Sequence, residues 1–131
     1  MSNNKFQRLS YASVWQQIDA YEKTLVAGAQ PIEIVSFDVT TISVLTITMS
    51  VYVAALKSLE VKVRGDSQAR WFTIPLDNLD AYGRTDYGTD INTTPAGEAC
   101  FITLNCHGWS DVIVYAKSDG ATKLSISAGG Q

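Results

Sequence analysis

Alternation of apolar and polar residues along most of the chain is the feature that most constrains its fold. The longest run sets apolar residues at positions 45, 47, 49, 51 and 53 against Thr46, Thr48, Ser50 and Tyr52. Shorter runs of the same kind cover residues 34–39, 59–64, 72–76, 100–104, 112–115 and 124–126. One apolar and one polar face are typical of antiparallel strands with a single buried side, and such a face must pack on a second sheet. We therefore predict a mainly β fold, an antiparallel β-sandwich or jelly-roll-like body over residues 31–131.

A helical period precedes Pro31. Between residues 10 and 27, apolar side chains recur at three- and four-residue steps: Tyr11, Val14, Trp15, Ile18, Tyr21, Leu25 and Val26. This spacing predicts one N-terminal amphipathic helix, with Ser13 and Gln16 as a capping box and Gly28 at its end. This apolar stripe packs either on the domain's own sheet or on a neighbouring subunit. In the second case the candidate interface residues are Tyr11, Trp15, Ile18 and Leu25. Residues 1–30 are then an arm with a helix, and residues 1–131 are a single domain.

Turn residues join the predicted strands. Asp119-Gly120 lies between two alternating runs and predicts a tight hairpin, and Gly65-Asp66 joins two more strands. Residues 77–97 show no clear period. Structureless stretches of this length are uncommon in compact domains and are often functional. This loop is therefore the first candidate for binding a ligand or a neighbouring subunit.

Charge is sparse along the chain. Only 18% of the 131 residues are charged, the net charge is −3, and the few basic residues are scattered. A phosphate backbone requires a stripe of Lys and Arg, so we expect no nucleic-acid partner. The first residues are polar and lack the apolar segment of a secretory signal, and residues 42–56 are too interrupted by Ser and Thr to span a bilayer. We expect no membrane partner and synthesis in the cytoplasm.

The sequence lacks a recognisable catalytic motif. His107 is the only histidine, and its neighbour Cys106 points to the opposite face if both lie in a strand. No nucleophile elbow, phosphate-binding glycine loop or dinucleotide fingerprint occurs. Cys100 and Cys106 lie about 20 Å apart along one strand, which is too far for a disulfide, so we predict free, buried thiols. Zinc requires four ligands, and these residues supply three at most. We therefore predict neither an enzyme nor a cofactor.

Aspartates and aromatic residues in the long loop and turns are the candidate binding groups. Loop carboxylates suit calcium, although no EF-hand spacing is present, and two of them acting as a hydrolase pair is a distant alternative. Aromatic rings at turns stack on sugars or anchor protein contacts. The candidate binding residues are Asp80, Tyr82, Asp86, Tyr87, Asp90 and Trp109.

The chain is small, poor in charge and all-β after its helix, and its polar strand faces carry Ser and Thr. In this it resembles the small virion proteins of bacteriophages, such as the β-sandwich decoration or cement proteins of capsids. The resemblance lies in overall character over residues 31–131. It implies a structural virion protein, made in the host cytoplasm, that binds the major capsid protein or other virion proteins. It also implies a closed homo-oligomer, often a trimer. The alternative function is a lectin-like carbohydrate-binding module that stacks glycans on Tyr82, Tyr87 or Trp109, with or without calcium.

Overall fold

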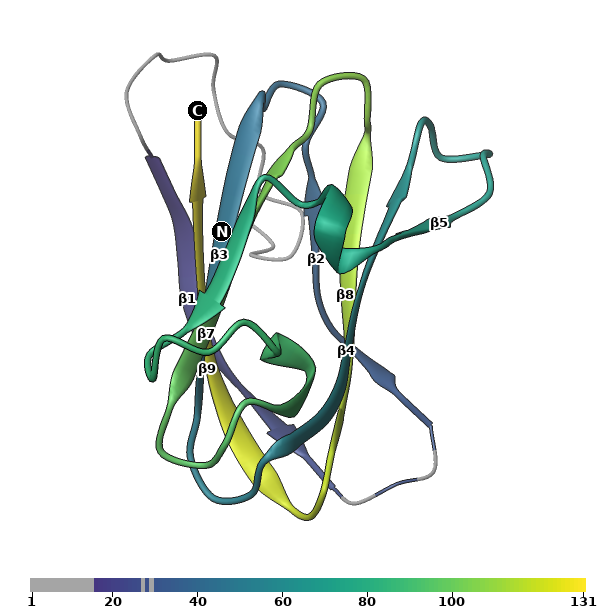
Figure 1. Cartoon of the computed structure of the whole chain (residues 1–131). Coiled ribbons are helices and arrows are strands. Elements are labelled where there is room, and N and C mark those ends of the chain that lie inside the picture. The colour runs from purple at the N-terminus through teal and green to yellow at the C-terminus, as the bar shows by residue number, and fades with distance from the viewer. Residues whose placement is uncertain (1–15, 27, 29) are drawn as a thin grey trace.

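The computed structural model describes residues 16–26, 28 and 30–131, which form two antiparallel sheets lying face to face (Figure 1). The five-stranded sheet has the order β1-β9-β3-β7-β6, and the four-stranded sheet has the order β2-β8-β4-β5. The strands are β1 (Gln16–Leu25), β2 (Ile32–Asp38), β3 (Val44–Val51), β4 (Leu56–Arg64), β5 (Phe72–Ile74), β6 (Ala81–Arg84), β7 (Ala99–Asn105), β8 (Asp111–Ser118) and β9 (Thr122–Gly130). Two 3₁₀ turns complete the described part, η2 (Leu76–Asn78) and η3 (Ile91–Thr93). The prediction of a mainly β, antiparallel fold is confirmed.

The core lies between the two sheets and is built from the apolar face of each alternating strand. In β3 every second residue from Leu45 to Val51 is buried, while the residues between them lie on the outer surface. The same alternation buries Ile102 in β7, Val114 in β8 and Ile126 in β9. Burying such side chains stabilises a fold by about 1.5–3 kcal/mol each. The strand pattern read from the sequence therefore marks which residues form the core.

The predicted N-terminal helix is wrong over residues 16–25, which form strand β1. This strand pairs with β9 in antiparallel register from Gln16 opposite Gly130 to Leu25 opposite Thr122. Residues 10–15 and 27 lie outside the described residues. Without β1, one edge of β9 presents unpaired backbone N–H and C=O groups. The free energy gained by pairing these groups exceeds the local preference of this segment for a helix. The β-branched and aromatic residues of the stripe also favour strands over helices.

The predicted hairpin at Asp119-Gly120 is also wrong. Strands β8 and β9 flank it but belong to different sheets, so this connection crosses from one sheet to the other. Strand β8 already pairs with β2 and β4, and β9 pairs with β1 and β3, so neither has a free edge for the other. By contrast, the strands joined through Gly65-Asp66 do pair, as β4 and β5.

The long segment 77–97 is more ordered than predicted. It contains the end of η2, strand β6 and turn η3, and β6 pairs with β7 at the edge of the five-stranded sheet. Strand β6 was missed because its four residues, Ala-Tyr-Gly-Arg, are too few to show a period. In the described residues, no helix is long and apolar enough to cross a membrane.

Candidate functional site

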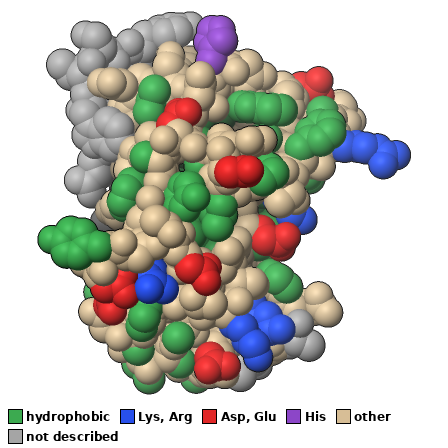
Figure 2. Space-filling view, viewed as in Figure 1, with side chains coloured by type: hydrophobic (Ala, Val, Ile, Leu, Met, Phe, Trp, Pro, Cys, Tyr) green, Lys and Arg blue, Asp and Glu red, His purple; other side chains and the backbone are tan. Residues whose placement is uncertain are grey.

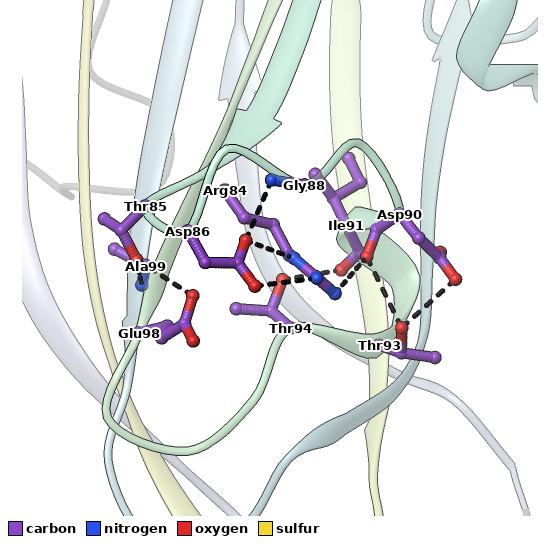
Figure 3. Close-up of polar contacts among 10 residues, drawn as sticks. All are labelled: Arg84, Thr85, Asp86, Gly88, Asp90, Ile91, Thr93, Thr94, Glu98 and Ala99. Atoms are coloured by element: carbon purple, nitrogen blue, oxygen red, sulfur yellow. Dashed lines mark hydrogen bonds and ion pairs between the residues drawn. The ribbon is translucent and has the colours of Figure 1, made fainter.

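A tight turn after β6 forms the centre of the candidate site (Figure 3). The backbone N–H of Arg84 donates to the carbonyl of Gly88 at 2.9 Å, and the N–H of Tyr87 donates to the carbonyl of Arg84 at 3.1 Å. The carboxylate of Asp86 accepts three hydrogen bonds: from Arg84 Nε at 3.0 Å, from Arg84 Nη2 at 2.8 Å and from the N–H of Gly88 at 2.9 Å. The turn is therefore closed by its backbone and braced by one ion pair.

The side chain of Arg84 stabilises this turn by hydrogen bonds to two parts of it. Its guanidinium also donates to the carbonyl of Asp90 at 3.1 Å, and its side chain is only 17% exposed. A Cβ at Gly88 would lie 2.5 Å from Arg84 Nη2, so a glycine is required there for the guanidinium to approach the backbone. The hydrogen bonds between Arg84 and Asp86 raise the pKa of the guanidinium and lower the pKa of the carboxyl. Both groups therefore remain charged at neutral pH.

Tyr87 projects from the tip of the turn. Its side chain is 98% exposed, and its backbone has φ of +67°. A bulky residue in the left-handed region is uncommon because its Cβ crowds the following carbonyl. Strain of this kind gathers at binding sites and switches, where the surrounding structure enforces it. A strained, fully exposed aromatic residue on a braced turn is thus the strongest candidate for a contact residue.

A hollow of about 360 Å³ lies beside Tyr87 on the outer side of the five-stranded sheet. Phe101 of β7 forms part of its lining, and its ring lies against the backbone of β6. A Cβ at Gly83 would be 3.1 Å from Phe101 Cε1. The ring of Phe101 therefore covers Gly83 and also borders the hollow. The other residues that line the hollow are Thr48, Arg84, Thr85, Ala99 and Cys100.

The outer face of the five-stranded sheet is uncharged across its central strands. Its outward residues there are Val44, Thr46, Thr48, Ser50, Ala99, Phe101, Thr103, Asn105, Ser125 and Ser127. The hydroxyls pair with one another across the strands, at 2.7 Å between Thr46 and Thr103 and at 2.6 Å between Thr48 and Ser127. Among the side chains that the structure describes, charges border this face at Lys123 and Glu22, which lie 3.7 Å apart, and at Arg84, Asp86 and Glu98 beside the turn after β6.

The outer face of the four-stranded sheet is charged. Arg64 forms an ion pair of 2.8 Å with Asp111, and its guanidinium also lies 4.3 Å from the centre of the Trp71 ring. Lys62 lies 4.9 Å from the centre of the Tyr115 ring. Figure 2 shows acidic and basic side chains interspersed with hydrophobic ones on the side of the molecule that it views. The two sheets therefore present surfaces of different character.

The structure brings some of the predicted binding residues together and separates others. Asp86, Tyr87 and Asp90 belong to the turn that Arg84 organises. Asp80 is exposed just before β6, where its N–H donates to the carbonyl of Thr103. The two remaining aromatic residues pack against the core: Tyr82 from β6, and Trp109 from the β7–β8 connection, where its ring lies 6.4 Å from that of Phe72.

Half of the predicted interface stripe lies outside the described residues. Tyr11 and Trp15 are outside the described residues. Ile18 falls at the register shift of β1, between Gln17 and Asp19. Leu25 is 1% exposed and belongs to the core of its own domain. Sequence reasoning missed Arg84, Thr48 and Phe101, and only the Ser/Thr alternation around Thr48 signalled an outward polar row.

The remaining candidate groups are metal-binding side chains and the two cysteine thiols. Within the described residues, no three His, Cys, Asp or Glu side chains are grouped closely enough to hold a metal ion. Cys100 and Cys106 are free and buried, as predicted. Burial raises the pKa of both thiols, that of Cys106 to about 12. Both thiols are therefore protonated at neutral pH, and a thiolate is the reactive form of cysteine.

Comparison with known proteins gives one informative similarity. The chain is similar in fold to the SPBc2 prophage-derived protein YomS. The crystal structure of that protein superposes with a TM-score of 0.56 and 13% sequence identity, covering 91% of this chain and 97% of that one. No protein-family model matches, and no curated protein matches. At this identity the similarity establishes the fold alone, over nearly the whole length of both chains.

Proposed function

We propose that this protein is a structural component of a bacteriophage particle, of the capsid decoration or cement type. In this role it acts without catalysis, by binding neighbouring virion proteins. It is made in the host cytoplasm and resides in the virion. Its binding surface is the outer face of the five-stranded sheet together with the Tyr87 turn.

The difference between the two outer faces is the observation that carries this proposal. Protein interfaces are depleted of charge at their centre and enriched in tyrosine and other aromatic residues. The central strands of the five-stranded sheet match this in two respects: they present no charge, and they carry Phe101 with Tyr87 beside it. Because Thr46 and Thr48 already share hydrogen bonds within the face, covering them leaves fewer polar groups unpaired. The charged four-stranded sheet then faces solvent.

The connectivity supports the same assignment. Strands β1, β2 and β3 pair with β9, β8 and β7, so the chain folds back on itself in the order of a jelly-roll sandwich, with β6 added at one edge. Viral capsid domains use this arrangement, as do lectin domains. YomS, which shares the fold, is described as prophage-derived. A phage setting is consistent with both.

The test is co-purification with particles. Phage particles are isolated on a density gradient from cells that express the gene with its neighbouring genes, and the chain is quantified by mass spectrometry. We expect a fixed ratio to the major capsid protein. Thr48→Lys, which places a charge in the uncharged face, is expected to remove the chain from particles. Thr73→Lys, a matched change at an exposed position of β5, is expected to leave it there. Absence of the wild-type chain from particles contradicts the proposal.

Carbohydrate binding is the second candidate, and the exposed ring of Tyr87 beside a hollow is the observation that favours it. Sugar sites, however, require polar groups that are free to fix hydroxyls, and Thr48, Thr85 and Arg84 are already hydrogen-bonded to protein partners. A calcium ion at this turn would also compete with Arg84 for the carboxylate of Asp86. Protein contact is therefore the better-supported function.

A further inference from the structure

The geometry points to a second copy of this chain as one partner of the uncharged face. Two copies pair through the outer faces of their five-stranded sheets about a two-fold axis, and Tyr87 of each copy enters the hollow of the other. This inference rests on the proposed function in using the same face, and it names the partner. Four features of the described residues carry it.

The first feature is a projection beside a recess on one surface. In a two-fold contact both copies use the same patch, so the patch must fit itself. A projecting group then needs a recess close by on its own surface. Tyr87 is fully exposed, and the hollow that it borders is larger than a tyrosine ring. When a second copy is rotated by 180°, the Tyr87 side chain of each copy can therefore insert into the space beside Phe101 of the other.

The second feature is the absence of charge across the centre of the face. The chain carries a net charge of −3, so two copies repel one another overall. A two-fold axis also brings like residues near one another, which makes any charge close to the axis unfavourable. The central outward positions of β3, β7 and β9 are Ser, Thr, Asn, Val, Ala and Phe. The centre of the face therefore brings no charges together when it meets its own copy, and the charges at its β6 edge, Arg84 and Asp86, neutralise each other in an ion pair.

The third feature is rigidity. The turn that presents Tyr87 is fixed by the Arg84–Asp86 ion pair and by the close approach of the guanidinium to Gly88. On the other side of the hollow, Phe101 lies against Gly83 and borders the cavity with its ring. Little conformational entropy is lost when parts that are already ordered come together, and tyrosine and phenylalanine rings pack favourably edge-to-face or offset.

The fourth feature is size. The three central strands, each of about eight residues at 3.3 Å and spaced about 4.8 Å apart, together with the four residues of β6, give a face of about 450 Å² in outline. Stable protein contacts bury about 800 Å² of accessible surface per partner. The projecting side chains and the Tyr87 turn add accessible surface to this outline and bring it toward that value. It is sufficient for a modest, reversible dimer.

The experiment is light scattering on a sizing column over a concentration series of the whole chain. A monomer has a mass of 14.3 kDa, and we expect that mass at dilution to rise to twice this value at high concentration. Tyr87→Ala and Thr48→Lys are each expected to raise the dissociation constant at least tenfold. Phe72→Ala, which removes an exposed aromatic ring on the other sheet, and Thr73→Lys are expected to leave it unchanged. Thermal unfolding verifies that each variant is folded.

Each alternative outcome overturns the inference. These outcomes are a monomer at every concentration, a trimer, or a dimer that both Tyr87→Ala and Thr48→Lys leave intact. A monomer whose Tyr87 and Phe101 signals shift in NMR spectra with a neutral oligosaccharide such as cellotriose would assign the hollow to glycans instead. The two proposals fail separately. A monomer that still co-purifies with particles refutes only self-pairing, and a dimer absent from particles refutes only the virion role.

Discussion

Replacing Tyr87 by glycine should make the isolated domain more stable while it weakens the contact that the domain makes. Tyr87 is 98% exposed, so removing its side chain sacrifices almost no burial. A residue with a Cβ in the left-handed region costs about 1–2 kcal/mol, and glycine avoids this cost. Glycine in turn loses about 0.5–1 kcal/mol through the greater freedom of the unfolded chain. The net expectation is a gain of about 0.5–1 kcal/mol.

The assay is urea unfolding of dilute protein, with Tyr87→Ala as the matched control. Alanine removes the ring but keeps the Cβ, so the strain at φ of +67° remains, and its unfolding free energy should stay within about 0.5 kcal/mol of the wild type. The glycine variant should unfold at a higher urea concentration than both, with a melting temperature raised by about 2–4 °C. In the light-scattering experiment both variants should dimerise equally poorly.

A glycine variant that unfolds at the same urea concentration as the alanine variant, or at a lower one, would refute the reasoning. That result would show that the Tyr87 backbone is not strained. It would also contradict the idea that the domain sacrifices folding stability at Tyr87 in order to present this side chain for a contact. A more stable glycine variant that dimerises as well as the wild type would keep the strain but reject the role of the ring.

Two further predictions concern the body of the domain. Ile47→Ala, in the centre of β3 with no exposure, should cost about 2–5 kcal/mol in urea unfolding, whereas its outward neighbour Thr48→Ala should cost less than about 1 kcal/mol; equal costs would contradict the assigned strand faces. The thiol of Cys106 has its pKa raised from 9.0 to about 12 in the folded protein, so the native state binds more protons than the unfolded state between these values. Its stabilising contribution should be fully present below pH 9 and be lost as pH rises toward 12. Cys106→Ala should therefore flatten the decline in stability between pH 8 and 11, and an unchanged decline would refute the role of the thiol.

The sequence by itself determined the strands of the core. Alternation in residues such as Leu45, Ile47 and Met49 follows from the geometry of a strand, in which successive side chains point to opposite faces. The pattern therefore marks buried and outward residues without knowledge of the partner sheet. Turn chemistry likewise marked the exposed position of Tyr87, which lies between Asp86 and Gly88.

Only the tertiary structure decided which strands pair and what the site contains. Residues 16–25 of the predicted helix form strand β1 because the edge of β9 needs backbone partners, and no local pattern records such an edge. Asp119-Gly120 joins two sheets because both flanking strands are already paired on each side. The hollow combines Thr48, Thr85 and Phe101 from β3, the turn after β6, and β7, which meet only through long-range register. The local sequence indicates which side chains of a segment face solvent and which face the core. The pairing register that brings the residues of a site together depends on hydrogen-bond partners that are distant in the chain.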